Sequence, residues 1–287
     1  MSKADHTLTA TPGFRAMKLS RDWITRPVFG VLLIAVWLAA IFAGRPYVEI
    51  VVAAAVAAAA REWHRMTGGG RFAVELAVTT GTVWLALLTY LFWPDKRVLP
   101  LVLMAGTLLV LAVSLLRRGN PLWQAGAVFY LGLPSLALLM LRDIRPHGIW
   151  IVVGLFLIVW ATDTGALFVG TTVGGPKLAP VLSPKKTWSG TIGGIVAAAA
   201  AQAVFIAILG GHVPAAAAYG ASIGVVAHLG DLFESMVKRH FHMKDSGSSI
   251  PGHGGVLDRV DSTISSTVAV AVAVFAFHLD PLFGALP

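Results

Sequence analysis

Residues 230–262 read GDLFESMVKRHFHMKDSGSSIPGHGGVLDRVDS. The chain has only 14 Asp and Glu residues, and five of them lie in this stretch: Asp231, Glu234, Asp245, Asp258 and Asp261. Basic residues and glycines are interspersed among these acids, whereas most of the remaining chain is apolar. A dense cluster of both charge signs beside long hydrophobic segments indicates a site for phosphate groups and a metal ion at a membrane surface.

The overall composition predicts a membrane protein. Hydrophobic residues make up 56% of the chain and charged residues 13%, against about 25% charged residues in soluble domains. The absence of cysteine excludes disulfides and thiolate metal sites. The net charge of +8 is not accompanied by the basic and aromatic interleaving of nucleic-acid-binding proteins. We therefore predict no nucleic-acid partner and an all-α, polytopic protein in a lipid bilayer.

Nine segments are apolar and long enough for a membrane span of about 20 residues. They are residues 27–44, 46–63, 73–93, 98–116, 122–141, 148–170, 189–210, 213–234 and 262–279. Glu49 interrupts the second segment, so an eight-span arrangement without it is the alternative.

The distribution of Lys and Arg favours nine spans. With the N-terminus in the cytoplasm, 17 of the 22 basic residues lie in cytoplasmic segments, as expected because cytoplasmic loops retain Lys and Arg. Omitting the second span destroys this alternation. We predict a cytoplasmic N-terminus, an external C-terminus and, at the start, a retained helix in place of a cleaved signal peptide.

This topology predicts a division of the chain. Residues 1–26 form a cytoplasmic tail, residues 27–147 an N-terminal set of transmembrane helices, and residues 148–287 a C-terminal catalytic region. The catalytic region includes cytoplasmic loops at 171–188 and 235–261. In the helix after the first loop, Gly190 and Gly194 form a small-residue pattern that predicts close packing against a neighbouring helix.

If the helix at 213–234 continues through DLFESMVKR, four polar residues share one face: Asp231, Glu234, Ser235 and Lys238. Carboxylates on such a face can hold a divalent cation, and the ammonium group one turn later can bind phosphate. The alternative is a helix end whose charges contact only water and one another.

Three other acids allow similar alternatives. Asp258 and Asp261 share a helical face at the entry to the last span, where an Asp can also act as a helix cap. Asp163 lies about 10 Å inside the cytoplasmic end of its span, by the rise of an α-helix. An acid at that depth indicates a functional site, although a structural hydrogen bond to a neighbouring threonine is an alternative. The Ser/Gly-rich segment ahead of Asp258 is either an anion-binding loop or a linker.

These residues resemble the C-terminal motif of the phosphatidate cytidylyltransferases. The matching run begins with Gly230-Asp231 and ends at Asp261, in order and spacing. A second match comprises Asp163, Gly170, Pro180 and the SPKKTW run at 183–188. Ser189 and Leu167 depart from the pattern, since the family usually has Glu and commonly has Tyr at these positions. The resemblance covers roughly residues 160–265.

The resemblance implies that CTP and phosphatidate give CDP-diacylglycerol and pyrophosphate, with Mg²⁺ and an auxiliary K⁺, at the cytoplasmic face of a bacterial inner membrane. We predict a metal site formed by Asp231 and Asp258 with Asp163. The predicted catalytic residues are Asp231, Lys238, Arg239, Lys244, Asp245, His253, Asp258, Arg259 and Asp261. The predicted substrate-binding residues are Ser183, Lys185, Lys186, Ser235, Gly254 and Gly255. The small-residue patterns are compatible with a homodimer.

Two other classes of function remain open from the residues alone. A CTP-dependent polyprenol kinase would use the same phosphate and metal chemistry but transfer the γ-phosphate. A transporter of anionic solutes would use intramembrane acids and basic loops to line a path, yet the charges of this chain gather at one face of the membrane. The spaced aspartates typical of CDP-alcohol phosphotransferases are absent from the sequence.

Overall fold

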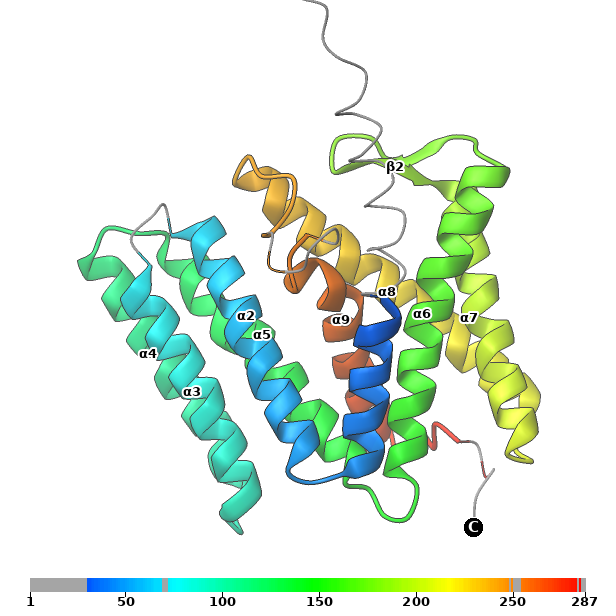
Figure 1. Cartoon of the computed structure of the whole chain (residues 1–287), viewed down its shortest axis with the longest axis horizontal. Coiled ribbons are helices and arrows are strands. Elements are labelled where there is room, and N and C mark those ends of the chain that lie inside the picture. Colours follow the sequence, from blue (N-terminus) through cyan, green and yellow to red (C-terminus); the bar gives the residue numbers. More distant parts are fainter. Residues whose placement is uncertain (1–29, 69–71, 248, 250–253, 283, 285–287) are drawn as a thin grey trace, which may run out of the picture.

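The computed structural model describes residues 30–68, 72–247, 249, 254–282 and 284. These residues form a bundle of long helices that run alongside one another (Figure 1). The helices are Gly30–Ala43, α2 (Tyr47–Thr67), α3 (Ala73–Phe92), α4 (Leu99–Leu116), α5 (Pro121–Arg142), α6 (Gly148–Thr172), α7 (Trp188–Ile208), α8 (Val213–His240) and α9 (Leu257–Phe275). A short 3₁₀ turn, η1 (Lys96–Val98), precedes α4. The predicted cytoplasmic tail, residues 1–26, lies outside the described residues.

Six helices of the described chain, α3 to α8, are long and apolar enough to cross a membrane. This confirms a polytopic, predominantly helical membrane protein. The helix Gly30–Ala43, α2 and α9 do not meet the same length and composition criterion, although they lie parallel to the others in Figure 1. The first is short, α2 bears charged residues near both ends, and α9 bears them in its first turns.

The outer surface of the bundle is apolar. On α4, Leu101, Leu108 and Leu116 are exposed, whereas Leu103 and Val110 are buried against neighbouring helices. Exposed leucines around a helix that is apolar on all sides are expected where the surroundings are lipid. The described surface therefore fits a bilayer environment.

The all-α prediction needs one correction. The loop between α6 and α7 contains an antiparallel hairpin of β1 (Lys177–Ala179) and β2 (Ser183–Thr187), in which Lys177 lies opposite Thr187. Pairing the two strands satisfies backbone groups that an irregular loop would leave to water. At the end of β2 the side chain of Thr187 accepts a hydrogen bond from the Gly190 backbone N–H at 3.1 Å and caps α7.

Glycines allow α6, α7 and α8 to pack closely, as the small-residue pattern predicts. A Cβ atom at Gly190 would lie 2.8 Å from the Ala166 carbonyl oxygen. One at Gly194 would lie 2.7 Å from both the Thr162 carbonyl oxygen and His228 Nε2. Contacts this short exclude a side chain, so the backbones of these helices approach where α6 carries Asp163.

Four helix limits differ from the predicted spans by about a turn or more. Helix α2 ends at Thr67 against a predicted 63, and α9 ends at Phe275 against 279. The structure extends α8 to His240, six residues beyond the predicted limit of 234, and begins α9 at Leu257, five residues before 262. The polar residues of 235–240 and 257–261 are therefore helical and extend the apolar spans. The C-terminal ends of α2, α6 and α8, the start of α9 and the hairpin lie at the same end of the bundle, the upper end in Figure 1.

Candidate functional site

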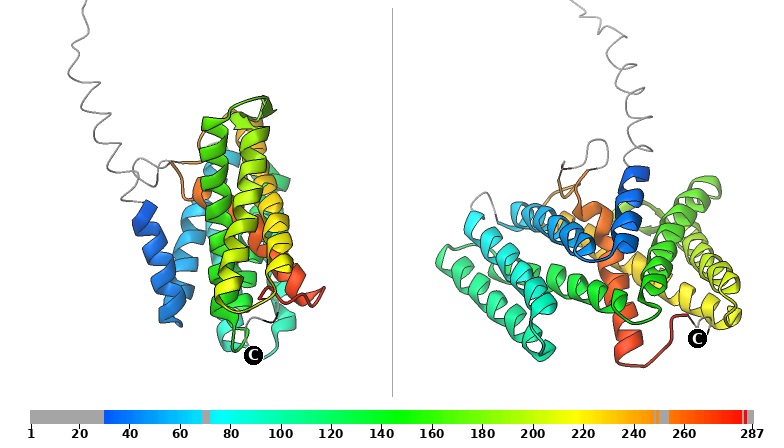
Figure 2. Two further views of the ribbon diagram at one scale, coloured as in Figure 1. Left: turned by 90° about the vertical axis from the view of Figure 1, so that its right-hand side faces the viewer. Right: turned by 60° about the horizontal axis from the view of Figure 1, so that its bottom comes forward.

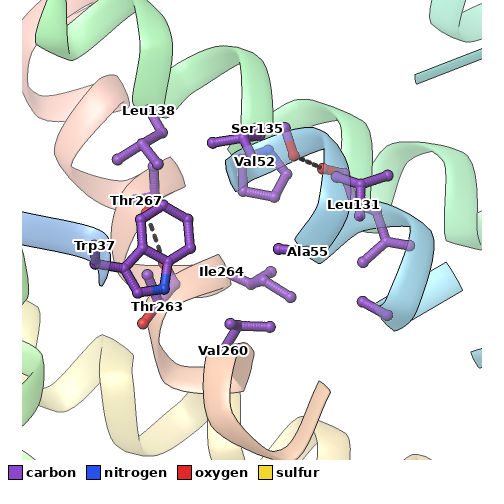
Figure 3. Close-up of a pocket in the computed structure, with 13 residues that line it drawn as sticks. Trp37, Val52, Ala55, Leu131, Ser135, Leu138, Val260, Thr263, Ile264 and Thr267 are labelled. Carbon is purple, nitrogen blue, oxygen red and sulfur yellow. Dashed lines mark hydrogen bonds between the residues drawn. The ribbon is translucent and has the colours of Figure 1, made fainter. Parts of the chain in front are cut away.

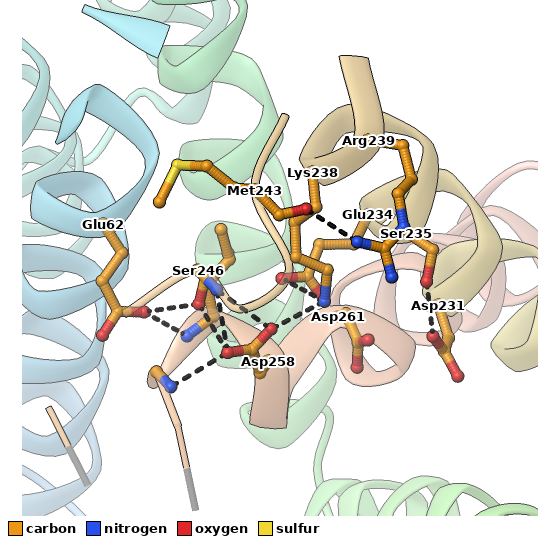
Figure 4. A network of polar contacts seen from close by, with 12 residues as sticks. Glu62, Asp231, Glu234, Ser235, Lys238, Arg239, Met243, Ser246, Asp258 and Asp261 are labelled. Carbon is orange, nitrogen blue, oxygen red and sulfur yellow. Dashed lines mark hydrogen bonds and ion pairs between the residues drawn. The ribbon is translucent and has the colours of Figure 1, made fainter. Parts of the chain in front are cut away.

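Lys238 lies at the centre of a group of buried charges on α8 and α9. Its Nζ atom is 2.7 Å from Asp258 Oδ1 and 3.4 Å from Glu234 Oε1 (Figure 4). The Lys238 side chain is 12% exposed, and Glu234 is fully buried. Because a buried ion requires a counter-charge, this lysine neutralises acids from two helices. The shared face of Asp231, Glu234 and Lys238 that the sequence predicts is confirmed as helical.

Asp258 is held by four donor groups. Besides Lys238, its carboxylate accepts hydrogen bonds from the Ser246 hydroxyl at 2.9 Å, the Ser246 backbone N–H at 3.1 Å and the Gly255 backbone N–H at 2.9 Å. Burial acts to raise the pKa of Asp258, but the hydrogen bond and charge of Lys238, together with the hydrogen bonds from Gly255 and Ser246, outweigh it, so the pKa lies below its ordinary value. Asp258 is therefore an anion fixed in position, and it does not cap its helix.

A second ion pair joins the hairpin to α8. Lys186 on β2 places its Nζ atom 2.5 Å from Asp231 Oδ2, and the Ser235 hydroxyl donates to Asp231 Oδ1 at 3.4 Å. Arg239 of α8 donates to the carbonyl oxygen of Leu182, in the turn of the hairpin, at 3.1 Å and to that of Met243, in the loop after α8, at 3.0 Å. The hairpin is thus held against the end of α8 by one ion pair and one backbone contact.

Two cavities meet at Asp163, whose side chain is exposed. The first, about 480 Å³, lies between α6, β2, α7 and α8 and includes Lys185, Lys186 and Asp231 in its lining. The second, about 450 Å³, lies between α6, α9, α2 and the helix Gly30–Ala43 and has polar and apolar parts. Asp163 lines both, so a group bound in one cavity lies beside a group bound in the other.

The second cavity has a polar end and an apolar continuation. Its charged lining residues are Asp163, Asp258, Arg259 and Asp261. A smaller apolar pocket of about 60 Å³ shares Trp37, Ala55, Val260 and Thr263 with it and continues between α2, α5 and α9 (Figure 3). A molecule with an anionic head and a hydrocarbon tail matches this arrangement.

The other predicted residues are distributed as follows. Lys244 and Asp245 are exposed in the loop after α8, and Ser183 is paired within the hairpin. Gly254 adopts a φ of +82°, which only glycine tolerates readily. His253 lies outside the described residues. The structure thus brings Asp163, Asp231, Lys238, Asp258 and Asp261 to one end of the bundle and places Lys244 and Asp245 on its surface.

Three further residues belong to this environment and were missed by sequence reasoning. Glu62 on α2 is 2% exposed and accepts hydrogen bonds from the loop between α8 and α9. Ser246 bridges Glu62 and Asp258 (Figure 4). Tyr130 on α5 packs against Phe233 of α8, with ring centroids 5.5 Å apart. The scarcity of acids in apolar segments could have indicated Glu62, whereas nothing in the sequence distinguishes Tyr130.

The donor atoms fit a magnesium ion that is completed by its substrate. Among the described residues no three His, Asp or Glu side chains form a ready-made metal cage. Asp163 and Asp231 do line the same cavity, and their carboxylate oxygens are the hard donors that Mg²⁺ requires. Magnesium sites commonly use one or two carboxylates together with substrate phosphates, so two aspartates that line one cavity suit a phosphate-bound ion.

Comparisons with known proteins agree with this chemistry. A sequence model described as "Cytidylyltransferase family" matches residues 24–277. A phosphatidate cytidylyltransferase of Brucella suis is 42% identical over 205 residues, which cover 68% of this chain and 74% of the relative. One of Bacillus subtilis is 32% identical over 253 residues, covering 84% and 93% of the two chains.

The ion-pair geometry predicts the effect of removing Lys238. Lys238→Met leaves Asp258 and Glu234 without their cation, and we expect it to lower the free energy of unfolding by about 3–5 kcal/mol, the usual cost of breaking a buried ion pair. Glu234→Gln added to Lys238→Met should restore part of the loss. Thermal unfolding in detergent, without nucleotide or divalent cations, measures this, with the exposed Lys185→Met as the control. Equal melting of the Lys238 and Lys185 variants would contradict the assigned pairing.

Proposed function

The chain belongs to the cytidylyltransferase family, and we propose that the cluster of Asp163, Asp231, Lys238 and Asp258 is its active site. The enzyme transfers the cytidylyl group of CTP to phosphatidate and releases CDP-diacylglycerol and pyrophosphate. The observation that carries the site assignment is that acids from α6, α8 and α9 line two cavities that meet at Asp163.

The lysines and the arginine of the site reduce the electrostatic repulsion between the two substrates. The phosphate of one substrate must approach the α-phosphorus of the other, and both substrates are anions. Lys186, Lys238 and Arg259 supply positive charge around the two cavities, so that the substrates and the developing charge on pyrophosphate are stabilised. The second pKa of a phosphate monoester is about 6, so near neutral pH the attacking oxygen needs no strong general base.

The aspartates hold the cofactor in this proposal. Asp231 and Asp258, with Asp163 between the cavities, would bind Mg²⁺, and K⁺ would serve as an auxiliary cation. Bound there, Mg²⁺ would supply charge neutralisation at the phosphate oxygens. The lysine partners Lys186 and Lys238 pair with Asp231 and Asp258 and orient their carboxylates.

The two cavities suit the two substrates. We assign the nucleotide to the cavity of Lys185, Lys186 and Asp231, where the hairpin contributes polar groups. We assign phosphatidate to the cavity that contains Arg259, because its apolar continuation past Trp37 and Ala55 can hold acyl chain. Asp163 then lies where the phosphates of the two substrates meet.

We propose that this end of the bundle faces the cytoplasm, with nine spans and the N-terminus inside. The support is the distribution of basic residues and the solubility of CTP, which reaches a membrane-bound lipid at the cytoplasmic surface. A homodimer remains a prediction from the small-residue patterns.

Single-cysteine labelling tests the topology, because the chain has no cysteine. Arg97→Cys lies in the exposed turn before α4, and Arg118→Cys lies in the exposed connection after it. We expect a membrane-impermeant maleimide to label Arg97→Cys in intact cells and Arg118→Cys only after permeabilisation. The reverse pattern would contradict the proposed orientation.

Neutralising the acids tests the site. Asp231→Asn and Asp258→Asn remove the charge that holds the cofactor and should each lower pyrophosphate release by about 100-fold or more. The assay uses purified protein, CTP, Mg²⁺ and phosphatidate in mixed micelles, and melting curves confirm folding. Asp95→Asn, an exposed acid paired with Arg97, is the matched control. Turnover like that of the wild type in either site variant would disprove its assignment, and transfer of label from γ-labelled CTP to lipid would indicate a kinase.

Filling each cavity separately tests the substrate assignment. Ala54→Phe adds a ring to the wall of the Arg259 cavity, and Ala166→Phe adds one to the wall of the Lys186 cavity. We expect the first to raise the KM for phosphatidate and the second to raise the KM for CTP, each by about tenfold, which corresponds to 1.4 kcal/mol. Leu109→Phe, on the exposed face of α4, should change neither constant. Exchanged effects would reverse the assignment.

A further inference from the structure

Glu62 of α2 is bound to the loop that carries the active-site glycines. Its Oε1 atom accepts from the Ser249 hydroxyl at 2.5 Å and the Val256 backbone N–H at 3.0 Å. Its Oε2 atom accepts from the Ser246 hydroxyl at 3.1 Å and the Leu257 backbone N–H at 2.8 Å. A single buried side chain from the N-terminal part of the chain thus receives four hydrogen bonds from residues 246–257.

The position of the Glu62 carboxylate also accounts for the start of α9. Backbone N–H groups in the first turn of a helix lack partners within the helix, and a carboxylate there is favoured by the helix dipole. Glu62 accepts from Val256 and Leu257, the residues at which α9 begins. Asp258, in the first turn, is consequently oriented by a side chain of another helix.

Two glycines of the loop are required by the same contact. A Cβ atom at Gly247 would lie 2.8 Å from Glu62 Oε1, and one at Gly255 would lie 2.4 Å from Glu62 Oε2. Any larger residue at either position displaces the carboxylate or the loop. The glycines at 247 and 255 therefore leave room for the Glu62 carboxylate, which lies nearly two hundred residues earlier in the chain.

Ser246 links Glu62 to Asp258 through hydrogen bonds to both carboxylates. Its fully buried hydroxyl is 3.1 Å from Glu62 Oε2 and 2.9 Å from Asp258 Oδ2, while its backbone N–H donates to Asp258 (Figure 4). Displacing the loop therefore moves three of the four donors that hold Asp258, namely the hydroxyl and the backbone N–H of Ser246 and the backbone N–H of Gly255. Lys238 then remains as the charged partner of Asp258 on α8.

From these contacts we propose that Glu62 is a positioning residue, which fixes the 246–257 loop and thereby sets Asp258 in the geometry needed for cytidylyl transfer. The proposal rests on the assignment of Asp258 to the active site. Some residues do not bind a metal themselves but orient the carboxylates that do. Such residues typically contribute 10- to 100-fold to metal affinity or activity. Glu62 is not among the residues that line the two cavities, so its effect must appear through the loop that it holds and through Asp258.

The test compares two buried acids of the same helix. Glu62→Gln keeps the shape of the side chain but turns one acceptor oxygen into a donor, whereas Glu49→Gln alters a buried acid near the opposite end of α2, where it pairs with Arg45. We expect Glu62→Gln to lower kcat by about 10- to 100-fold and to raise the Mg²⁺ concentration for half-maximal activity. Glu49→Gln should keep the kinetic constants of the wild type.

Hydrogen exchange supplies a readout that does not depend on activity. In Glu62→Gln the amide of Val256 or that of Leu257 should exchange at least about tenfold faster, because the glutamine keeps one acceptor oxygen and leaves one of the two amides without an acceptor, while exchange in α3 and α4 is unchanged. Gly247→Ala, which displaces the same carboxylate, should reproduce the faster exchange. Unaltered exchange in Glu62→Gln, or an equal loss of kcat in both acid variants, would overturn the proposal. A wild-type protein that releases no pyrophosphate would instead refute the active-site assignment, and the exchange data would still decide whether Glu62 holds the loop.

Discussion

The structure depends on the pairing of Lys238 with Asp258 and Glu234 at the end of an apolar bundle. Removing a carboxylate from water is unfavourable unless a counter-charge and hydrogen bonds replace the water. The chain meets this requirement by placing one ammonium between acids of α8 and α9, so the two helices are fixed relative to each other. The same pairing keeps a negatively charged group at the edge of a cavity, where a phosphate-bound cation can use it.

Asp258, Asp231 and Asp163 lie in different surroundings at this end of the bundle, and the differences separate their proposed roles. Asp258 is held on several sides, by Lys238 and by backbone and hydroxyl donors of the loop. Asp231 is paired with Lys186 of the hairpin, so a change in the hairpin position alters the charge around it. Asp163 is exposed to both cavities. Rigid and accessible carboxylates are thus combined in one site, which suits a reaction whose main demand is the positioning of two polyanions.

The sequence predicted the helices well because long apolar segments have few alternatives in a bilayer, and the limits of α3 to α7 agree with it to within two residues. The spacing of Asp231, Glu234 and Lys238 likewise predicted a shared face, since helical geometry alone decides it. The hairpin was missed because β1 has only three residues and depends on its pairing with β2. Glu62 was missed because its partner Ser246 is 184 residues away, and no local pattern encodes such a contact.

The contacts of Glu62 also bear on how the two halves of the chain cooperate. Helix α2 belongs to the segment before residue 148, yet it supplies the acceptor for the first backbone N–H groups of α9. Helix α5, from the same segment, packs Tyr130 against Phe233 beside the acids of α8. A loop with several glycines has many conformations to lose on ordering, and four hydrogen bonds to a buried carboxylate offset that entropy better than contacts with mobile surface groups. The early helices thus do more than anchor the chain in lipid, because the order of the loop around Asp258 depends on an acid that they provide.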